Sequence, residues 1–227
     1  MGGVTTMVKK EFVKNIFTSF LGDGGLYISY KCTNPNAYFQ FSQLDIHQDY
    51  IDWMYNFLSE LTSVRIVNTT PEKGKPYTRL ITKTNPIYTK IYKRVYFARR
   101  KVIDPHYLKL LDWQSLARWY MDDGSLLLGD KRWPGNQIKI YSQAFSYADN
   151  WLLKKYLKEE FDLEFNINKL TKGDYFLYYL NLRSKDFVKF VDGISEYVFP
   201  SFEYKLGILE RYRTSGSSEE SEDGDIV

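Results

Sequence analysis

The chain has 227 residues, of which 44% are hydrophobic and 26% charged, and these proportions permit one large soluble domain or two small ones. No apolar run has the length of a membrane span, the N-terminus lacks a signal-peptide pattern, and the single cysteine, Cys32, excludes an internal disulfide. The net charge of +3 hides an asymmetry, because residues 214–227 hold five acids and no base. The body therefore carries 31 bases against the remaining 23 acids, or +8, which suits either a polyanionic partner or solubility alone.

The first half of the chain reads as the element order α-β-β-α-β-β-α. After a loose lead-in at residues 1–7, helix-forming and apolar-periodic segments predict helices at 9–21, 47–61 and 86–95. Alternating apolar and polar residues predict strands at 26–31, 37–42, 64–67 and 77–82.

The second half repeats this order. Its opening helix ends at Asp123, and further helices are predicted at 148–161 and 185–197, with a last helical piece at 204–206. The strands are predicted at 125–128, 137–141, 163–168 and 175–182. We therefore expect an α+β fold of two pseudo-symmetric αββαββα repeats, at residues 1–105 and 106–213, as in a dimer fused into one chain. The composition of residues 214–227 predicts a disordered acidic tail.

Two of the predicted helices end in the same way, with an Asp followed by a Gly and then a strand. Asp23 and Asp123 lie 100 residues apart, and each follows an apolar helix. We expect Gly24 and Gly124 to be the left-handed residues that close these helices. A carboxylate is unfavourable at the negative end of the helix dipole, so a cation there would offset the cost.

Other residues recur at the same offset. Ser42-Gln43 returns as Ser142-Gln143, and Asp49 returns as Asp149. Strand alternation disagrees by one residue, because it pairs the apolar positions 39 and 41 with 138 and 140. Since a slip of one residue reverses the face of a strand, we follow the alternation for facing and treat the Ser-Gln match as approximate.

Helices that end at Asp23 and Asp123 and pack side by side would bring both carboxylates to one place. Their mutual repulsion would raise one pKa, and a divalent cation would remove the conflict. Carboxylate and carbonyl oxygens are hard ligands that suit Mg²⁺, and such acids fit in-line attack at phosphorus. A single Asp-Gly pair is more often only a helix stop, so the duplication carries this interpretation.

The predicted strands have one apolar and one polar face, and the polar face can serve nucleic acid or simply solvent. Its members share the parity that faces away from the apolar core and are Tyr27, Ser29, Lys31, Gln40, Ser42, Arg79, Lys83, Gln137, Lys139, Tyr141, Tyr179, Asn181 and Arg183. Such side chains hydrogen-bond base edges and phosphates. The strands start beside each Asp, so we expect the polar face and the acids to point the same way.

These motifs resemble those of the LAGLIDADG homing endonucleases of the single-chain, two-motif kind, and in particular the branch with the omega-intron endonuclease of yeast mitochondria. Residues 116–124, Leu-Ala-Arg-Trp-Tyr-Met-Asp-Asp-Gly, resemble the second motif, and residues 16–24 the first. The resemblance covers about residues 9–213. It implies a β-saddle over double-stranded DNA, cleavage of both strands of a long asymmetric site with Mg²⁺ or Mn²⁺, 3′ overhangs and intron homing by a monomer.

The resemblance also implies roles for individual residues. Asp23 and Asp123 correspond to the metal ligands, assisted by the carbonyls of Gly22 and Asp122, and Lys101 and Lys205 to basic residues beside each site, with Arg100 as the alternative to Lys101. The residues that we expect to contact DNA are Ser29, Lys31, Gln40, Ser42, Arg79, Lys83, Lys131, Arg132, Lys139, Tyr141, Asn181 and Arg183.

The second motif departs from the pattern at one interface. Small residues usually let the two motif helices touch, and Thr18 and Gly22 keep that in the first motif, whereas Arg118 and Asp122 replace them in the second. Two other hypotheses remain open: an RNA maturase that binds its host intron, and a DNA binder that does not cleave. The absence of a presequence favours synthesis in an organelle, a mitochondrion or plastid, and no membrane partner is expected.

Overall fold

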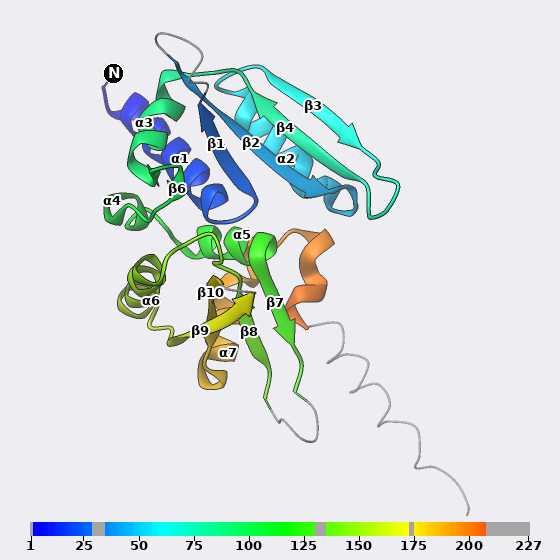
Figure 1. Cartoon of the computed structure of the whole chain (residues 1–227), viewed down its shortest axis with the longest axis vertical. Helices are drawn as coiled ribbons and strands as arrows, with labels where there is room; N and C mark the ends of the chain where they lie inside the picture. The colour runs from blue at the N-terminus through cyan, green and yellow to red at the C-terminus, as the bar shows by residue number, and fades with distance from the viewer. Residues whose placement is uncertain (1, 29–34, 130–134, 173–174, 208–227) are drawn as a thin grey trace, which may run out of the picture.

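Two four-stranded antiparallel sheets form the framework of the molecule, and they share one strand order. The computed structural model describes residues 2–28, 35–129, 135–172 and 175–207. The first sheet has the order β1-β2-β4-β3, with β1 (Gly24–Ile28), β2 (Ala37–Leu44), β3 (Val64–Thr69) and β4 (Tyr77–Thr82). The second has the order β7-β8-β10-β9, with β7 (Gly124–Leu127), β8 (Gln137–Ile140), β9 (Phe165–Lys172) and β10 (Tyr175–Leu182). Figure 1 shows the first sheet above and the second below.

The strand registers confirm that the alternation of apolar and polar residues, rather than the Ser-Gln match, predicts which side chains share a face of the sheet. Gly24 pairs with Phe41, and Gly124 pairs with Ile140. The first strands of the two repeats are therefore offset by 100 residues and the second strands by 99. With an offset of 99, Gln43 corresponds structurally to Ser142. The sequence match had paired Gln43 with Gln143, which is one residue further along the chain.

The two motif helices lie in contact between the sheets. They are α1 (Gly2–Leu21) and α5 (Trp113–Asp123). The expected loose lead-in was wrong, because α1 begins at Gly2. Gly and Thr are weak helix formers, so propensity alone placed the start too late. Ile16, Phe17 and Phe20 of α1 are completely buried.

The remaining helices pack against the sheets and the motif helices. In the first repeat these are η1 (Asp45–His47), α2 (Gln48–Ser59) and α3 (Pro86–Val95). In the second they are α6 (Tyr147–Phe161) and α7 (Phe187–Ile194). The predicted helix at 185–197 is divided into η2 (Ser184–Asp186), α7 and η3 (Ser195–Tyr197). Among the described residues, no helix has the length and apolar character needed to cross a bilayer.

Four short elements either were not predicted from the sequence or extend a predicted one. The strands β5 (Tyr96–Phe97) and β6 (Arg100–Lys101) form a hairpin whose turn residues Ala98 and Arg99 have positive φ. The hairpin leads into α4 (Pro105–Leu108), and near the end of the second repeat η4 (Pro200–Leu206) extends the piece predicted at 204–206. Ala and Arg are unusual at positive φ, which is why no turn was predicted there. β6 and η4 carry Lys101 and Lys205, the two lysines that the sequence analysis singled out.

Candidate active site

The ends of α1 and α5 meet closely, and Gly22 allows it. A Cβ atom placed on Gly22 would overlap the Cβ of Asp122, so any side chain there would force the helices apart. The backbone N–H of Asp23 donates a hydrogen bond of 3.2 Å to Oδ2 of Asp122. The last turn of each motif helix is therefore packed against the other.

Gly24 and Gly124 have a different role from the one expected. Gly124 has φ −86° and ψ 151°, which is an extended conformation and not a left-handed one. A Cβ there would overlap both the ring and the carbonyl oxygen of Tyr120. At Gly24 a Cβ would lie 2.7 Å from the carbonyl oxygen of Ser19. The glycines are required because each strand folds back tightly against the last turn of its helix.

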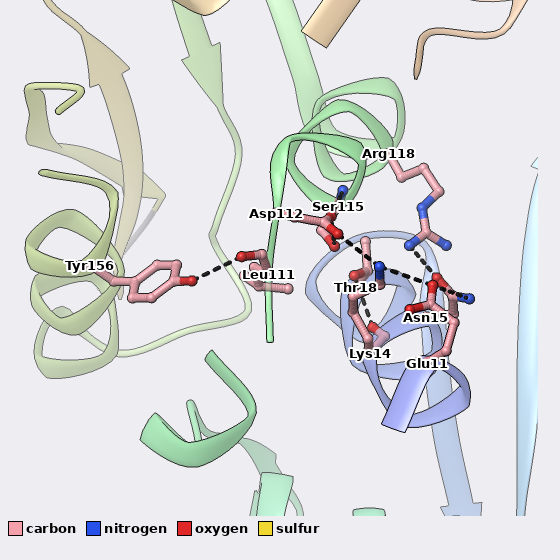
Figure 2. Close-up of polar contacts among 9 residues, drawn as sticks. All are labelled: Glu11, Lys14, Asn15, Thr18, Leu111, Asp112, Ser115, Arg118 and Tyr156. Carbon is pink, nitrogen blue, oxygen red and sulfur yellow. Dashed lines mark hydrogen bonds and ion pairs between the residues drawn. The ribbon is translucent and has the colours of Figure 1, made fainter. Parts of the chain in front are cut away.

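Polar contacts between α1 and α5 hold the helices together despite the bulky second motif. Figure 2 shows Lys14 of α1 paired with Asp112, which caps the start of α5, at 2.7 Å. Nη2 of Arg118 donates to Oδ1 of Asn15 at 2.5 Å, and its guanidinium lies 5.0 Å from the centre of the Trp53 ring. Arg118 thus crosses to α1 and α2 at the side of the interface, and the contact at Gly22 is preserved.

Three carboxyl groups share this place, and each has a raised pKa. Burial raises the pKa of Asp23 to about 6 and that of Asp123 to about 7, and the charge of Asp23 adds to the effect at Asp123. Burial and the charges of both neighbours hold the pKa of Asp122 well above its usual range. Among the described residues, Oδ1 of Asp122 is buried without a hydrogen bond of good geometry, although the nearby Tyr50 hydroxyl acts to lower the pKa of this carboxyl group. The site is therefore an electrostatically unfavourable cluster that a cation would stabilise.

Each lysine caps the C-terminal carbonyls of its own motif helix. Nζ of Lys101 donates to the carbonyl oxygens of Phe20 at 2.6 Å, Gly24 at 3.0 Å and Gly22 at 3.4 Å. Nζ of Lys205 donates to the carbonyl oxygen of Met121 at 2.5 Å, in the equivalent turn of α5. The cations thereby oppose the negative end of each helix dipole.

Burial and the neighbouring acids have opposite effects on the pKa of both lysines. Burial lowers the pKa of Lys101 to about 8, although Asp123, Asp23 and Asp122 act in the opposite direction. Burial likewise lowers the pKa of Lys205. Arg100, the alternative to Lys101, is exposed. The geometry therefore places Lys101 at the cluster.

Gln43 is a site residue that the sequence analysis missed. Its Nε2 donates to Oδ2 of Asp23 at 2.9 Å, and its Oε1 accepts from the N–H of Leu44 at 2.9 Å, which fixes the orientation of the amide. This bond favours the ionised form of Asp23. A polar residue at the buried parity of β2, two positions beyond the partner of Gly24, was the signal that could have identified it.

The chemistry of the cluster fits a hard divalent cation. Among the described residues no group of three or more His, Cys, Asp and Glu is placed to hold a metal ion. Mg²⁺ does not need such a cage, since it usually binds through one or two carboxylates, waters and the phosphates of a substrate. Asp23 and Asp123 are the two carboxylates of this site that could hold such an ion. The carbonyl of Gly22 already accepts from Lys101 and is therefore less available, whereas the expected role of the Asp122 carbonyl stays a prediction.

The polar face of the first sheet is as predicted at its described positions. Ser42 pairs with Arg79, and Gln40 pairs with Ile81, so these residues share a face with Tyr27. Gln40, Ser42 and Arg79 are half-buried and Lys83 is exposed. The expected positions Ser29 and Lys31 lie outside the described residues.

The second sheet has an equivalent polar face. Lys139 pairs with Asn181 and with Ser125, and Tyr141 is 40% exposed at the end of the same strand. Arg183 lies beyond β10, where it pairs with Glu164 at 2.7 Å, so its guanidinium is already engaged. Lys131 and Arg132 lie outside the described residues.

The chain consists of two equivalent α+β repeats. They meet at acidic helix ends that lie beside the polar faces of the two sheets, and this arrangement indicates the class of protein. A family model described as the LAGLIDADG DNA endonuclease family matches residues 14–190, and the chain belongs to that family. It is 31% identical over 129 residues to an intron-encoded endonuclease, ai4, of Dictyostelium discoideum, covering 56% of this chain and 76% of that protein.

Two further comparisons extend over most of the chain. The chain is 27% identical over 210 residues to a protein named RecA from Mycolicibacterium chitae, covering 89% of this chain and 47% of the relative. The chain thus spans about half the length of the first curated relatives. The structure of the homing endonuclease I-WcaI bound to its DNA recognition sequence has the same fold, with a TM-score of 0.69, 21% identity and coverage of 90% of this chain and 92% of that one.

Proposed function

We propose that this chain is a site-specific endonuclease that cleaves both strands of double-stranded DNA, promotes the homing of an intron and works as a monomer with Mg²⁺ or Mn²⁺. One observation carries the proposal: Asp23 and Asp123, from helix ends 100 residues apart, share one electrostatic site with Lys101 and Lys205. The site lies where a polar-faced strand of each sheet begins, so a duplex on those faces would present its phosphates there.

The acids and lysines have distinct proposed roles. Asp23 and Asp123 hold the metal, which when bound supplies charge stabilisation at the phosphorus and a nucleophilic water. Lys101 and Lys205 stabilise negative charge that develops on the phosphate oxygens. Gln43 orients Asp23 through its amide hydrogen bond. In support, the structure of I-DmoI in complex with DNA and Ca has the same fold, with a TM-score of 0.53 and 18% identity over 90% of this chain.

The two sheets are proposed to read the target. Gln40, Ser42, Arg79 and Lys83 of the first repeat face the duplex, and Lys139, Tyr141, Asn181 and Arg183 do so in the second. Ser29, Lys31, Lys131 and Arg132, which lie outside the described residues, are proposed as DNA contacts from the sequence alone. Arg183 would exchange its ion pair with Glu164 for a phosphate. Repeats 1–105 and 106–213 would each read one half of an asymmetric site.

Cleavage of a randomised duplex library tests this proposal, because the library lets the protein select its own target. The protein is incubated with the library and Mg²⁺, and cleaved ends are recovered by adaptor ligation and sequenced. We expect one family of related targets with staggered cuts on both strands, and no recovery with EDTA or with Asp23→Asn or Asp123→Asn. Binding of the recovered target in Ca²⁺ should persist in both variants. Metal-dependent binding without cuts, or cuts that survive the double variant, would contradict the proposal.

A further inference from the structure

The two active-site lysines lie on short segments outside the two four-stranded sheets. Lys101 is in the two-residue strand β6, and Lys205 is in the 3₁₀-helix η4. A lysine side chain has four flexible methylenes, so the position of its Nζ depends on how firmly its backbone is anchored. Contacts that anchor these segments therefore affect the geometry of the acidic cluster.

Asp149 anchors the segment of Lys101 from the opposite repeat. Its Oδ1 accepts the backbone N–H of Ile103 at 2.9 Å, and both residues are buried, at 8% and 5% exposure. Its Oδ2 accepts from the N–H of Ser146 at 3.1 Å, in the capping box that starts α6. One carboxylate thus joins the first turn of α6 to the chain two residues after Lys101.

Asp49, which belongs to the first repeat, anchors the segment of Lys205 in the second repeat. Its Oδ2 accepts the backbone N–H of Ser201 at 3.1 Å, and its Oδ1 accepts the Ser201 hydroxyl at 2.6 Å. The ring of His47 stacks on Phe202 with 3.7 Å between centroids, and its Nδ1 lies 3.0 Å from the Ser201 hydroxyl. These contacts join the start of α2 to η4, four residues before Lys205.

The two aspartates occupy equivalent positions in the repeats, whereas their partners differ, since Ile103 follows Lys101 by two residues and Ser201 precedes Lys205 by four. Asp49 and Asp149 are 100 residues apart, as Asp23 and Asp123 are, and each lies in the first turn of the second long helix of its repeat. Each crosses to the other repeat. A buried carboxylate that only capped its own helix would not need a partner across the interface.

We propose that Asp49 and Asp149 are positioning residues, each of which holds, from one repeat, the segment that delivers the active-site lysine of the other repeat. The inference rests on the proposed nuclease function. It makes the two halves of the protein mutually dependent: α6 sets the position of Lys101, and α2 sets that of Lys205. Because misplacement of a catalytic group by about 1 Å can slow a reaction up to about 100-fold, loss of an anchor should reduce the rate about tenfold.

The test measures cleavage of each strand separately. The recovered target, labelled on one strand or the other, is cut under single-turnover conditions by Asp149→Ala, Asp49→Ala, Lys101→Met, Lys205→Met and the matching double variants. Ser146→Ala is the control for Asp149, because it weakens the α6 cap and leaves the bond to Ile103. Asp52→Ala, an exposed carboxylate on α2, is the control for Asp49.

We expect Asp149→Ala and Lys101→Met to slow the same strand about tenfold or more, and Asp49→Ala and Lys205→Met the other. In a Lys101→Met background, Asp149→Ala should add less than about twofold, and both controls should keep the wild-type strand ratio. Asp149→Ser, which is too short to reach Ile103, replaces the alanine variant should that fail to fold.

Equal slowing of both strands by the Asp variants, or effects that multiply with those of the lysine variants, would overturn the positioning role. Unchanged rates in both lysine variants would instead refute the catalytic role of the lysines, and the anchors would then have no function in cleavage.

Discussion

Replacing Asp123 by Asn should stabilise the metal-free protein while it abolishes cleavage. Burial raises the pKa of Asp123 from 3.8 to about 7. The folded state therefore binds this proton more tightly than the unfolded state, so the group favours folding at low pH. That contribution is lost as the pH rises from about 4 to about 7, and above this range the ionised carboxylate costs stability.

The size of this cost follows from the interval between the two values. Roughly three pH units at about 1.4 kcal/mol each give an upper limit of about 4 kcal/mol. Asp123 is only half-buried, so solvent screening reduces the expected effect to about 2 kcal/mol. For a chain of this length that corresponds to a melting temperature higher by about 4–8 °C.

Thermal or urea unfolding in EDTA at several pH values measures the effect. Asp123→Asn should match wild type near pH 4 and exceed it by about 2 kcal/mol at about pH 8. Added Mg²⁺ should stabilise wild type and reduce the difference. Asp192→Asn, which removes an exposed carboxylate on α7, is the matched control and should change neither curve. Parallel curves for wild type and Asp123→Asn across this pH range would refute the reasoning.

Three further predictions concern single groups at the site. Gly124→Ala should cost about 2 kcal/mol in the free energy of unfolding, because its Cβ would overlap Tyr120; a loss below about 0.5 kcal/mol in urea unfolding would contradict the close approach. Lys101 loses its proton as the pH rises through about 8, so cleavage of the DNA strand that Lys101→Met slows should decline above that pH. Lys101→Arg should extend the pH-rate profile upward, and an unchanged alkaline limb would argue against the role. Gln43→Leu removes a hydrogen-bond donor to Asp23 and should raise the pKa of that carboxyl group. The acidic limb of the pH-rate profile for cleavage should then move above about pH 6. An unmoved limb would show that the Gln43 amide does not affect the pKa of Asp23.

The contacts that connect the repeats were not accessible from the sequence. The match of Asp49 with Asp149 was visible, but its meaning depends on Ser201 and Ile103, which lie far away along the chain. Gln43 likewise lies at a buried parity, and only the register of β1 with β2 brings it to Asp23. Contacts between residues far apart in the chain depend on tertiary packing, which local sequence patterns do not encode.

The sequence by itself determined the order of elements, the twofold repeat and the pair of helix-ending aspartates, because hydrophobic periodicity and Asp-Gly punctuation are local properties of the chain. It indicated the wrong reason for Gly24 and Gly124 and placed the start of α1 too late. Only the tertiary structure decided that Gly22 lies against Asp122, that Lys101 rather than Arg100 lies beside the acids, and that each glycine is needed for close packing. These features depend on where two distant helix ends meet, and that distance is set by the folded core.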